Sequence, residues 1–309
     1  MHSGFEFSKI LLSKINIEDR TFLFSFPKRN IFLKESIKKL GLLQPPILLK
    51  TDNEYKIIAG EGRILALIEL GFEEVHAFIT QENNPKKLLF ISFESNAFRT
   101  LNLVEKADFF EKVLKFFSIE EAISFLPLLG FTKHYSWMEF LKGINKLISE
   151  FKELLVKEEL NPRVIQLIAI LSEQEQKKLL NFYQKIKPSF SEQRKILHKL
   201  FDLKKRYSFN TILPDFLMEI LKEEDFNIRK KRFLEEVFRL YYPNYSKKLE
   251  EIQPYIEKFK TRGIFVSPCP YFEKKELEVR LNILSEEDTV KIDFLKENLP
   301  LISKILRKI

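Results

Sequence analysis

The placement of glycine is the feature that most constrains the fold of this chain. Its 309 residues contain only eight glycines, and four of them, Gly41, Gly60, Gly62 and Gly71, fall within a stretch of thirty-one residues. Glycine adopts backbone conformations that other residues avoid, and it lets another group approach the main chain closely. The cluster therefore predicts a segment of tight turns with close approach to the backbone.

Apolar residues change their spacing near Pro85. Before this residue, short extended segments alternate with one short apolar helix, which indicates a small mixed α/β sheet. After it the spacing is helical for most of the chain, until a strand-like alternation over residues 277–283. The predicted strands cover residues 10–17, 46–49, 54–59 and 75–79, and the predicted helices cover residues 64–70, 85–97, 103–117, 119–129, 137–148, 162–171, 173–186, 191–206, 214–222, 229–240, 247–259 and 286–298.

These patterns predict an α+β chain in three parts. Residues 1–100 are expected to form a small mixed-sheet domain, and residues 101–205 a helical domain. Residues 206–309 are expected to form a second helical region that ends in a β-hairpin and a helix, a small α/β cap. A chain of this length and apolar content can build two or three separate cores.

Composition excludes several classes of protein. No stretch approaches the roughly 20 uncharged apolar residues that a membrane-spanning helix needs, so we expect a cytoplasmic protein. Cys269 is the only cysteine, which excludes a disulfide framework within the chain and a multi-cysteine metal site. The net charge of +8 is spread evenly, and the compact basic runs 204–206 and 229–232 are more typical of solvated helix faces than of phosphate contacts.

The turn after residue 59 is the strongest candidate for a binding site. A strand that ends at Ala59, turns through Gly60 and Gly62, and enters a helix at Arg63 brings backbone N–H groups and a helix N-terminus to one point. An arginine in the first helical turn opposes the helix dipole, so an anion explains its presence better than helix stability does. The alternative is an ordinary strand–turn–helix junction with a surface arginine.

Five runs of sequence around this turn resemble a known family, in order and in spacing. They are S36-I-K-K-L-G-L-L-Q-P-P-I47, I57-I-A-G-E-G-R-I-L-A66, G71-F-E-E-V75, N96-A-F-R99 and L101-N-L-V-E-K-A107. Together they resemble the ParB amino-terminal domain, which has the ParB/sulfiredoxin fold, and they cover about a third of the chain. The chain resembles a divergent member of the ParB-type partition protein family.

The resemblance implies a ligand and a set of binding residues. ParB domains bind CTP with magnesium, and the nucleotide gates a DNA clamp. By the same resemblance, the nucleotide-binding residues would be Gln44 near the base or sugar, Gly60, Glu61, Gly62 and Arg63 at the triphosphate, and Asn96 and Arg99 on the metal and phosphate side, with Glu94 as a second metal candidate.

Several positions depart from the family pattern. Gly62 and Leu65 stand where the family usually has arginines, and Ser95 stands where it has a glutamate. Glu94 is offset from that position by one residue, which rotates its side chain by ~100° on a helix. We therefore expect at most a weak CTPase, and metal binding is in question. Sulfiredoxin chemistry needs a cysteine in this loop, which has none.

Residues 120–130 followed by 136–147 occupy the place of the helix-turn-helix module of ParB proteins. The residues that would contact DNA are Lys133, His134, Tyr135, Ser136 and Lys142. Trp137 and Phe140 are expected to pack in a core or against a partner, and His134 to have a structural role. If DNA is bound, backbone contacts should dominate, with modest sequence specificity.

Three hypotheses about function follow. The first is a ParB-like, nucleotide-responsive, DNA-associated protein in chromosome partition or related regulation, acting as a homodimer. The second is a degenerate ParB-fold interaction module that does not hydrolyse nucleotide. The third and most remote is a phosphotransfer enzyme for a small hydroxyl substrate, with Glu61 as the general base.

Overall fold

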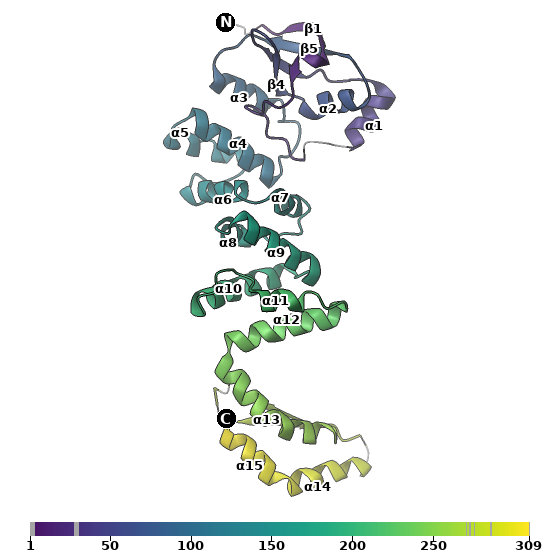
Figure 1. The fold of residues 1–309 in the computed structure, drawn as a ribbon, viewed down its shortest axis with the longest axis vertical. Helices are drawn as coiled ribbons and strands as arrows, with labels where there is room; N and C mark the ends of the chain where they lie inside the picture. Colours follow the sequence, from purple (N-terminus) through teal and green to yellow (C-terminus); the bar gives the residue numbers. More distant parts are fainter. Residues whose placement is uncertain are drawn as a thin grey trace. The chain divides into compact units, whose positions relative to one another are not determined.

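The computed structural model describes residues 4–27, 31–269, 271, 273–274, 276–284 and 286–308. The chain divides into two compact units, residues 1–181 with 188–197 and residues 182–187 with 198–309. The first unit contains a five-stranded sheet, and the second a two-stranded sheet. The predicted class is confirmed, because a small mixed sheet is followed by a mainly helical region and a small α/β element at the end (Figure 1).

The five-stranded sheet has the strand order β1-β5-β3-β4-β2. β1 pairs with β5 and β3 with β4 in antiparallel fashion, whereas β3 and β5, and β2 and β4, are parallel. The sequence predicts a small mixed α/β sheet for this segment, and the structure adds the pairing of its strands. The strands are β1 (Glu6–Leu11), β2 (Ile15–Asn16), β3 (Ile47–Lys50), β4 (Tyr55–Ala59) and β5 (Glu74–Thr80).

Three helices surround this sheet: α1 (Ile31–Leu40), α2 (Glu61–Glu69) and α3 (Pro85–Glu94). Ile57 of β4 belongs to one apolar cluster with Ile64 and Leu67 of α2. The next residue, Ile58, is fully buried and points to the opposite face, since alternate strand residues do so. α3 packs against β4. Because β4 is covered on both faces, it holds the start of α2 firmly in place.

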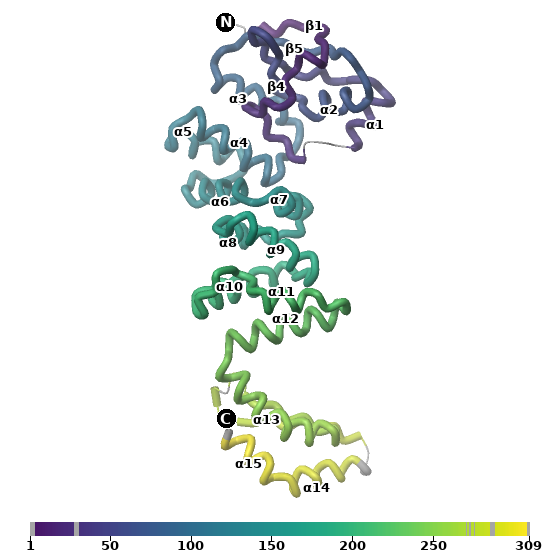
Figure 2. The backbone as a smooth tube through the Cα atoms, in the orientation of Figure 1, coloured from purple at the N-terminus to yellow at the C-terminus, as the bar shows by residue number. Residues whose placement is uncertain are grey.

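The helical part of the first unit begins with two capped helices. Asn102 starts α4 and Ser118 starts α5, each through a capping box with the glutamate three residues later. Figure 2 follows the backbone through the helices that come next. The helices that begin in this part of the unit are α4 (Leu103–Phe116), α5 (Ile119–Ile123), α6 (Tyr135–Asn145), α7 (Ser149–Val156), α8 (Ile165–Ala169), α9 (Glu173–Ile186) and α10 (Phe190–Arg206).

The single helix predicted over residues 119–129 is wrong. α5 ends at Ile123, and residues 126–129 form a separate 3-10 turn that ends at Gly130. Pro127 lies at the start of this turn, where its missing N–H is tolerated, whereas inside a continuous α-helix it would break a hydrogen bond. The first helix of the expected helix-turn-helix is therefore only five residues long.

Two buried glutamines brace the connections between these helices. Gln176 accepts a hydrogen bond from the Ile148 amide at 2.9 Å and donates to the carbonyls of Lys146 and Leu171. Gln193 likewise accepts a hydrogen bond from the Asn161 amide and donates to the carbonyls of Glu159 and Pro188. Each side chain therefore forms hydrogen bonds with three main-chain groups that lie in the connections, outside the helices.

Gln176→Ala is expected to lower the free energy of unfolding by about 2 kcal/mol, because it leaves buried donors and acceptors without partners. Gln174→Ala in the same helix is the control, since that side chain is exposed and should change stability by less than about 0.5 kcal/mol. Unfolding in urea, followed by the fluorescence of the single tryptophan, measures both. Equal midpoints for the two variants would contradict the bracing role.

The second unit ends in the predicted α/β cap. β6 and β7 form an antiparallel hairpin whose residues Ile264 and Val266 pack with Ile252 and Phe259 of α13. None of the helices in the described part of the chain has the length and apolar character that a membrane crossing requires. The elements are α11 (Asp215–Ile220), α12 (Phe226–Tyr241), α13 (Pro243–Lys260), β6 (Ile264–Pro268), β7 (Leu277–Leu281), α14 (Val290–Glu297) and α15 (Leu299–Lys308).

Candidate anion-binding site

The junction between β4 and α2 has the geometry of an anion site. Gly60 has a φ of 97°, a left-handed conformation that favours glycine, and it takes the N-cap position with no side chain to accept hydrogen bonds from the first turn. α2 begins at Glu61, two residues before the predicted start at Arg63. Gly62 thus lies in the first turn, where amides lack intrahelical acceptors, and its amide donates to no acceptor within the described part of the chain.

A cavity of about 630 Å³ opens at this junction. Its lining comes from the loop before β3, the first turn of α2, the start of α1 and the segment that follows α3. The volume lies within the range of about 300–1,000 Å³ that small-ligand sites occupy. The structure brings all seven predicted nucleotide-binding residues together around this cavity: Gln44, Gly60, Glu61, Gly62, Arg63, Asn96 and Arg99. Their binding roles remain predictions.

Arg63 supplies the positive charge at the start of α2. Its guanidinium folds back beside Gly60 and donates from Nη1 to the main-chain oxygens of Gln44, at 2.8 Å, and Pro45, at 3.1 Å. Burial lowers the pKa of the Arg63 guanidinium. Among the described residues no carboxylate lies within ion-pair distance of it. A bound anion would therefore stabilise a partly buried cation that has only carbonyl partners.

Glu61 is the acidic residue at the same helix start. Its carboxylate is almost fully buried and forms an ion pair with Arg20, which lies 41 residues earlier in the chain. This pairing neutralises a charge that would otherwise repel an incoming phosphate. It also engages the carboxylate that the phosphotransfer hypothesis needs as a general base. Sequence reasoning missed Arg20, because no local pattern connects it to the glycine turn.

Asn96 and Arg99, which also line the cavity, are held in place by hydrogen bonds within the protein. Arg99 donates from both terminal nitrogens to the Glu105 carboxylate, at 2.7 Å each, and from Nε to the Asn96 side-chain oxygen at 3.1 Å. Glu105 is 2% exposed and also accepts from the amides of Asn102 and Phe26. Glu105 therefore fixes the position of Arg99, a role that the sequence analysis did not assign.

The residues present do not fit a magnesium ion held by protein carboxylates. Glu94 is exposed and does not line the cavity, and the side-chain oxygen of Asn96 already accepts from Arg99. The carboxylates that do line it, Glu61 and Glu105, are each paired with an arginine. Within the described residues no group of three or more metal-binding side chains occurs. The predicted metal role of Asn96 and Glu94 thus gains no support.

Four of the five residues predicted to contact DNA lie at the start of α6, whereas Lys142 lies in its last turn. His134 caps this helix by accepting from the Ser136 amide at 3.1 Å, which is the structural role expected of it. Lys142 forms an exposed ion pair with Glu139. The side chains exposed to solvent here are those of Lys133, His134, Tyr135 and Ser136.

Two further positions limit the surface that could contact DNA. Trp137 packs between the rings of Phe131 and Phe140, as the sequence analysis expected. Arg229, in the second basic run, is largely buried and donates to the main-chain oxygens of Lys185 and Glu223. These side chains therefore stabilise the fold and are not available to phosphates.

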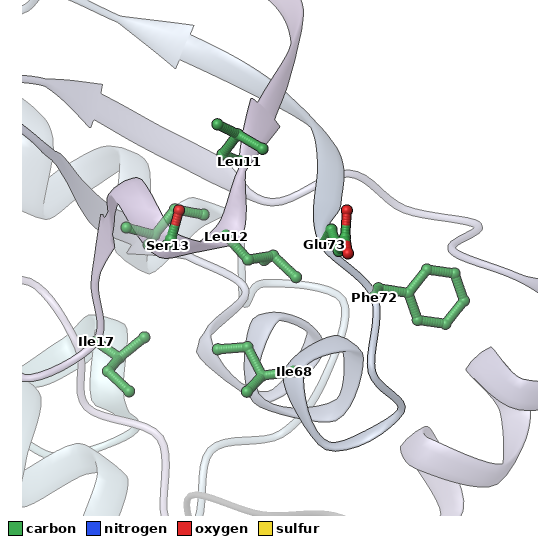
Figure 3. Close-up of a pocket in the computed structure, with 8 residues that line it drawn as sticks. Leu11, Leu12, Ser13, Ile17, Ile68, Phe72 and Glu73 are labelled. Atoms are coloured by element: carbon green, nitrogen blue, oxygen red, sulfur yellow. The ribbon is translucent and has the colours of Figure 1, made fainter.

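A second cavity of about 530 Å³ lies near the opposite end of α2 (Figure 3). Leu11, Leu12, Ile17, Ile68 and Phe72 make most of its lining. No lysine or arginine lines it, so it lacks the charge that a phosphate requires. The cavity at the start of α2, unlike this one, offers the positive charge that an anionic ligand needs.

Comparison with known proteins identifies the region that holds this site. The model of the ParB N-terminal domain family matches residues 14–96. The probable chromosome-partitioning protein ParB of Campylobacter jejuni is 36% identical over 91 residues, which cover 29% of this chain and 32% of that protein. The nucleoid occlusion protein of Oceanobacillus iheyensis is 28% identical over 161 residues, 49% of this chain and 55% of that protein. The chain thus spans about a third to a half of these relatives.

Solved structures with lower identity also match. The match to the structure of a Pnob8-like ParB-N domain covers 77% of this chain and 98% of the chain in that structure, with a TM-score of 0.36 and 16% identity. The C-terminally truncated ParB of Caulobacter crescentus in complex with CTP-gamma-S matches 57% of this chain and 99% of its own, with a TM-score of 0.24 and 22% identity. The family match over residues 14–96, which form most of the mixed sheet and the glycine turn, confirms the resemblance of this part of the chain to the ParB N-terminal domain.

Proposed function

We propose that this chain binds a nucleoside triphosphate at the start of α2 and acts as a DNA-associated protein in chromosome partition or a related process. The observation that carries the proposal is the convergence of Gly60, Gly62 and Arg63 with Asn96 and Arg99 around one cavity. CTP is the first candidate, because the family resemblance implies it. The relatives named for chromosome partitioning and nucleoid occlusion support a role on DNA.

The geometry supports phosphate binding by main-chain and guanidinium groups. An anion placed beside Gly62 would accept from its amide and meet the positive end of the helix dipole of α2. Arg63 would add a charge-assisted hydrogen bond if one of its nitrogens turns from the Gln44 carbonyl toward the ligand. Arg20 assists indirectly, since it neutralises Glu61.

Isothermal titration calorimetry of the full chain with CTP, ATP and GTP, each with and without magnesium, tests the proposal. We expect heat with CTP that persists in a chelator, because the cavity offers no carboxylate cluster for a metal. Absence of binding to all three nucleotides would overturn the proposal. Binding that requires magnesium would show that the metal is held through the phosphates.

Gly60→Ala is expected to weaken CTP binding by at least about tenfold. A Cβ at this position would lie 3.0 Å from the guanidinium of Arg63, which would have to shift by a few tenths of an ångström to make room for it. Gly71→Ala is the matched control, because its φ of 78° brings the same backbone strain while nothing lies within 4 Å of its added Cβ. Both variants should lose similar stability in thermal melts. Equal CTP affinity in the two variants would contradict the placement of the phosphates.

DNA association is the second part of the proposal. The cationic excess is dispersed, so contacts to the DNA backbone should dominate. In an electrophoretic mobility assay we expect a complex with duplex DNA at low salt whose apparent affinity falls steeply when the salt is raised. If no shifted band appears at either salt concentration, with or without CTP, the DNA-binding part of the proposal is wrong.

A second candidate function is a degenerate ParB-fold interaction module that does not hydrolyse nucleotide. It is favoured by the pairing of Glu61 with Arg20 and of Glu105 with Arg99, which leaves both carboxylates of the cavity engaged. A phosphate-release assay with CTP separates this candidate from an active CTPase. We expect release close to the uncatalysed background, and sustained release would contradict the non-hydrolysing module.

A further inference from the structure

Two phenylalanine side chains stand exposed at the cavity that holds the glycine turn. Phe32, near the start of α1, is 87% exposed, and Phe98, just after α3, is 71% exposed. Both line the same cavity as Gly60 and Arg63. Neither ring packs against another aromatic ring within the described part of the chain, unlike the exposed rings on β1 and β5, which pack on one another. Exposing two large apolar rings to water is unfavourable unless something covers them.

The lining of the cavity is divided by chemistry. The part formed by Gly60, Gly62 and Arg63 offers main-chain groups and positive charge, whereas Phe32 and Phe98 offer flat apolar faces. A ligand that matches this lining has an anionic end and a planar aromatic end. A nucleotide has both, and stacking of a base on an aromatic side chain does not depend on which base it is.

We propose that Phe32 and Phe98 stack against the base of the nucleotide whose phosphates bind at the start of α2. This inference rests on the proposed function and adds two residues that bind the nucleoside part of the ligand. The base buries the exposed rings, and the rings in turn hold the base without reading its hydrogen-bonding edge. Discrimination among bases is then left to polar groups such as Gln44, which also lines the cavity.

Calorimetric titrations of the full chain with CTP and with inorganic tripolyphosphate test the proposal. Phe32→Ala and Phe98→Ala are each expected to weaken CTP binding by about tenfold, the scale of one base–aromatic stack, while tripolyphosphate binding stays as in the wild type. Phe98→Trp should keep the wild-type affinity for CTP, because it keeps an aromatic face. Both phenylalanines are so exposed that their loss should leave the fold intact.

Phe72→Ala is the control, because this ring is 50% exposed and lines the cavity of about 530 Å³, away from the start of α2. It should change neither titration. Unchanged CTP affinity in both Phe32→Ala and Phe98→Ala would overturn the stacking role while leaving the proposed function intact, and so would an equal loss of CTP and tripolyphosphate binding. Should the two variants instead shift the chain to smaller assemblies in light scattering with CTP affinity unchanged, the rings would contact a second copy, and the proposal would be wrong. If the wild-type chain binds neither CTP nor tripolyphosphate, the proposed function itself is overturned.

Discussion

Replacing Glu105 with alanine is expected to lower the free energy of unfolding by about 3 kcal/mol. Its buried carboxylate joins four groups: both terminal nitrogens of Arg99, and the amides of Asn102 and Phe26. The substitution removes half of the capping box of α4 and leaves Arg99 without its counter-charge. The estimate is at the low end for a broken ion pair, because the side chain of Arg99 is 31% exposed and water screens part of the interaction.

Thermal unfolding followed by tryptophan fluorescence measures this loss. The only tryptophan, Trp137, lies in the same compact unit as Glu105, so the signal reports on that unit. We expect Tm to fall by roughly 6–12 °C. The Tm of Glu105→Gln should lie between those of the wild type and Glu105→Ala, because glutamine keeps the shape and an acceptor oxygen but loses the charge. Lys115→Ala, on the exposed side of α4, is the control. A Tm for Glu105→Ala equal to that of the control would contradict the central role of this carboxylate.

Arg63→Ala is expected to weaken nucleotide binding by about 10- to 100-fold, the largest effect on binding of any single substitution here. The variant removes the only guanidinium at the start of α2 that has no carboxylate partner within the described structure. The variant also leaves the carbonyls of Gln44 and Pro45 without the hydrogen bonds that Arg63 donates to them. Titration calorimetry with CTP gives the change directly.

Arg63→Lys separates charge from geometry. Lysine keeps the positive charge but cannot hold two carbonyls and a phosphate with a planar fork, so we expect an intermediate affinity. Arg280→Ala serves as the control, since this arginine pairs with Glu278 on the surface of the other unit. CTP affinity that is unchanged in Arg63→Ala would remove the electrostatic basis of the proposed site.

The fold was predictable wherever local patterns decide it. The helix over residues 173–186 was predicted to the residue, because a polar first turn and a regular apolar spacing mark both ends. α7 was missed because its N-cap is Ile148, which has no capping side chain. α15 was missed because Pro300 reads as a helix breaker, although it stands in the first turn, where proline is tolerated.

The candidate site was predictable only in part, for a physical reason. The glycine turn, Gln44 and Asn96 belong to sequence motifs, and the structure places them around one cavity. Arg20 and Glu105 were missed, since ion pairs between distant residues leave no periodic signal. The exposure of Phe98 was equally invisible, because an aromatic residue in sequence is expected to lie in a core.

Hydrogen–deuterium exchange of the full chain, with and without saturating CTP, tests most directly whether phosphates bind at the first turn of α2. CTP is expected to slow exchange in peptides that cover residues 57–66 and 96–102, with no change in peptides from the second unit. CTP that binds by calorimetry yet leaves exchange over residues 57–66 unchanged would contradict it.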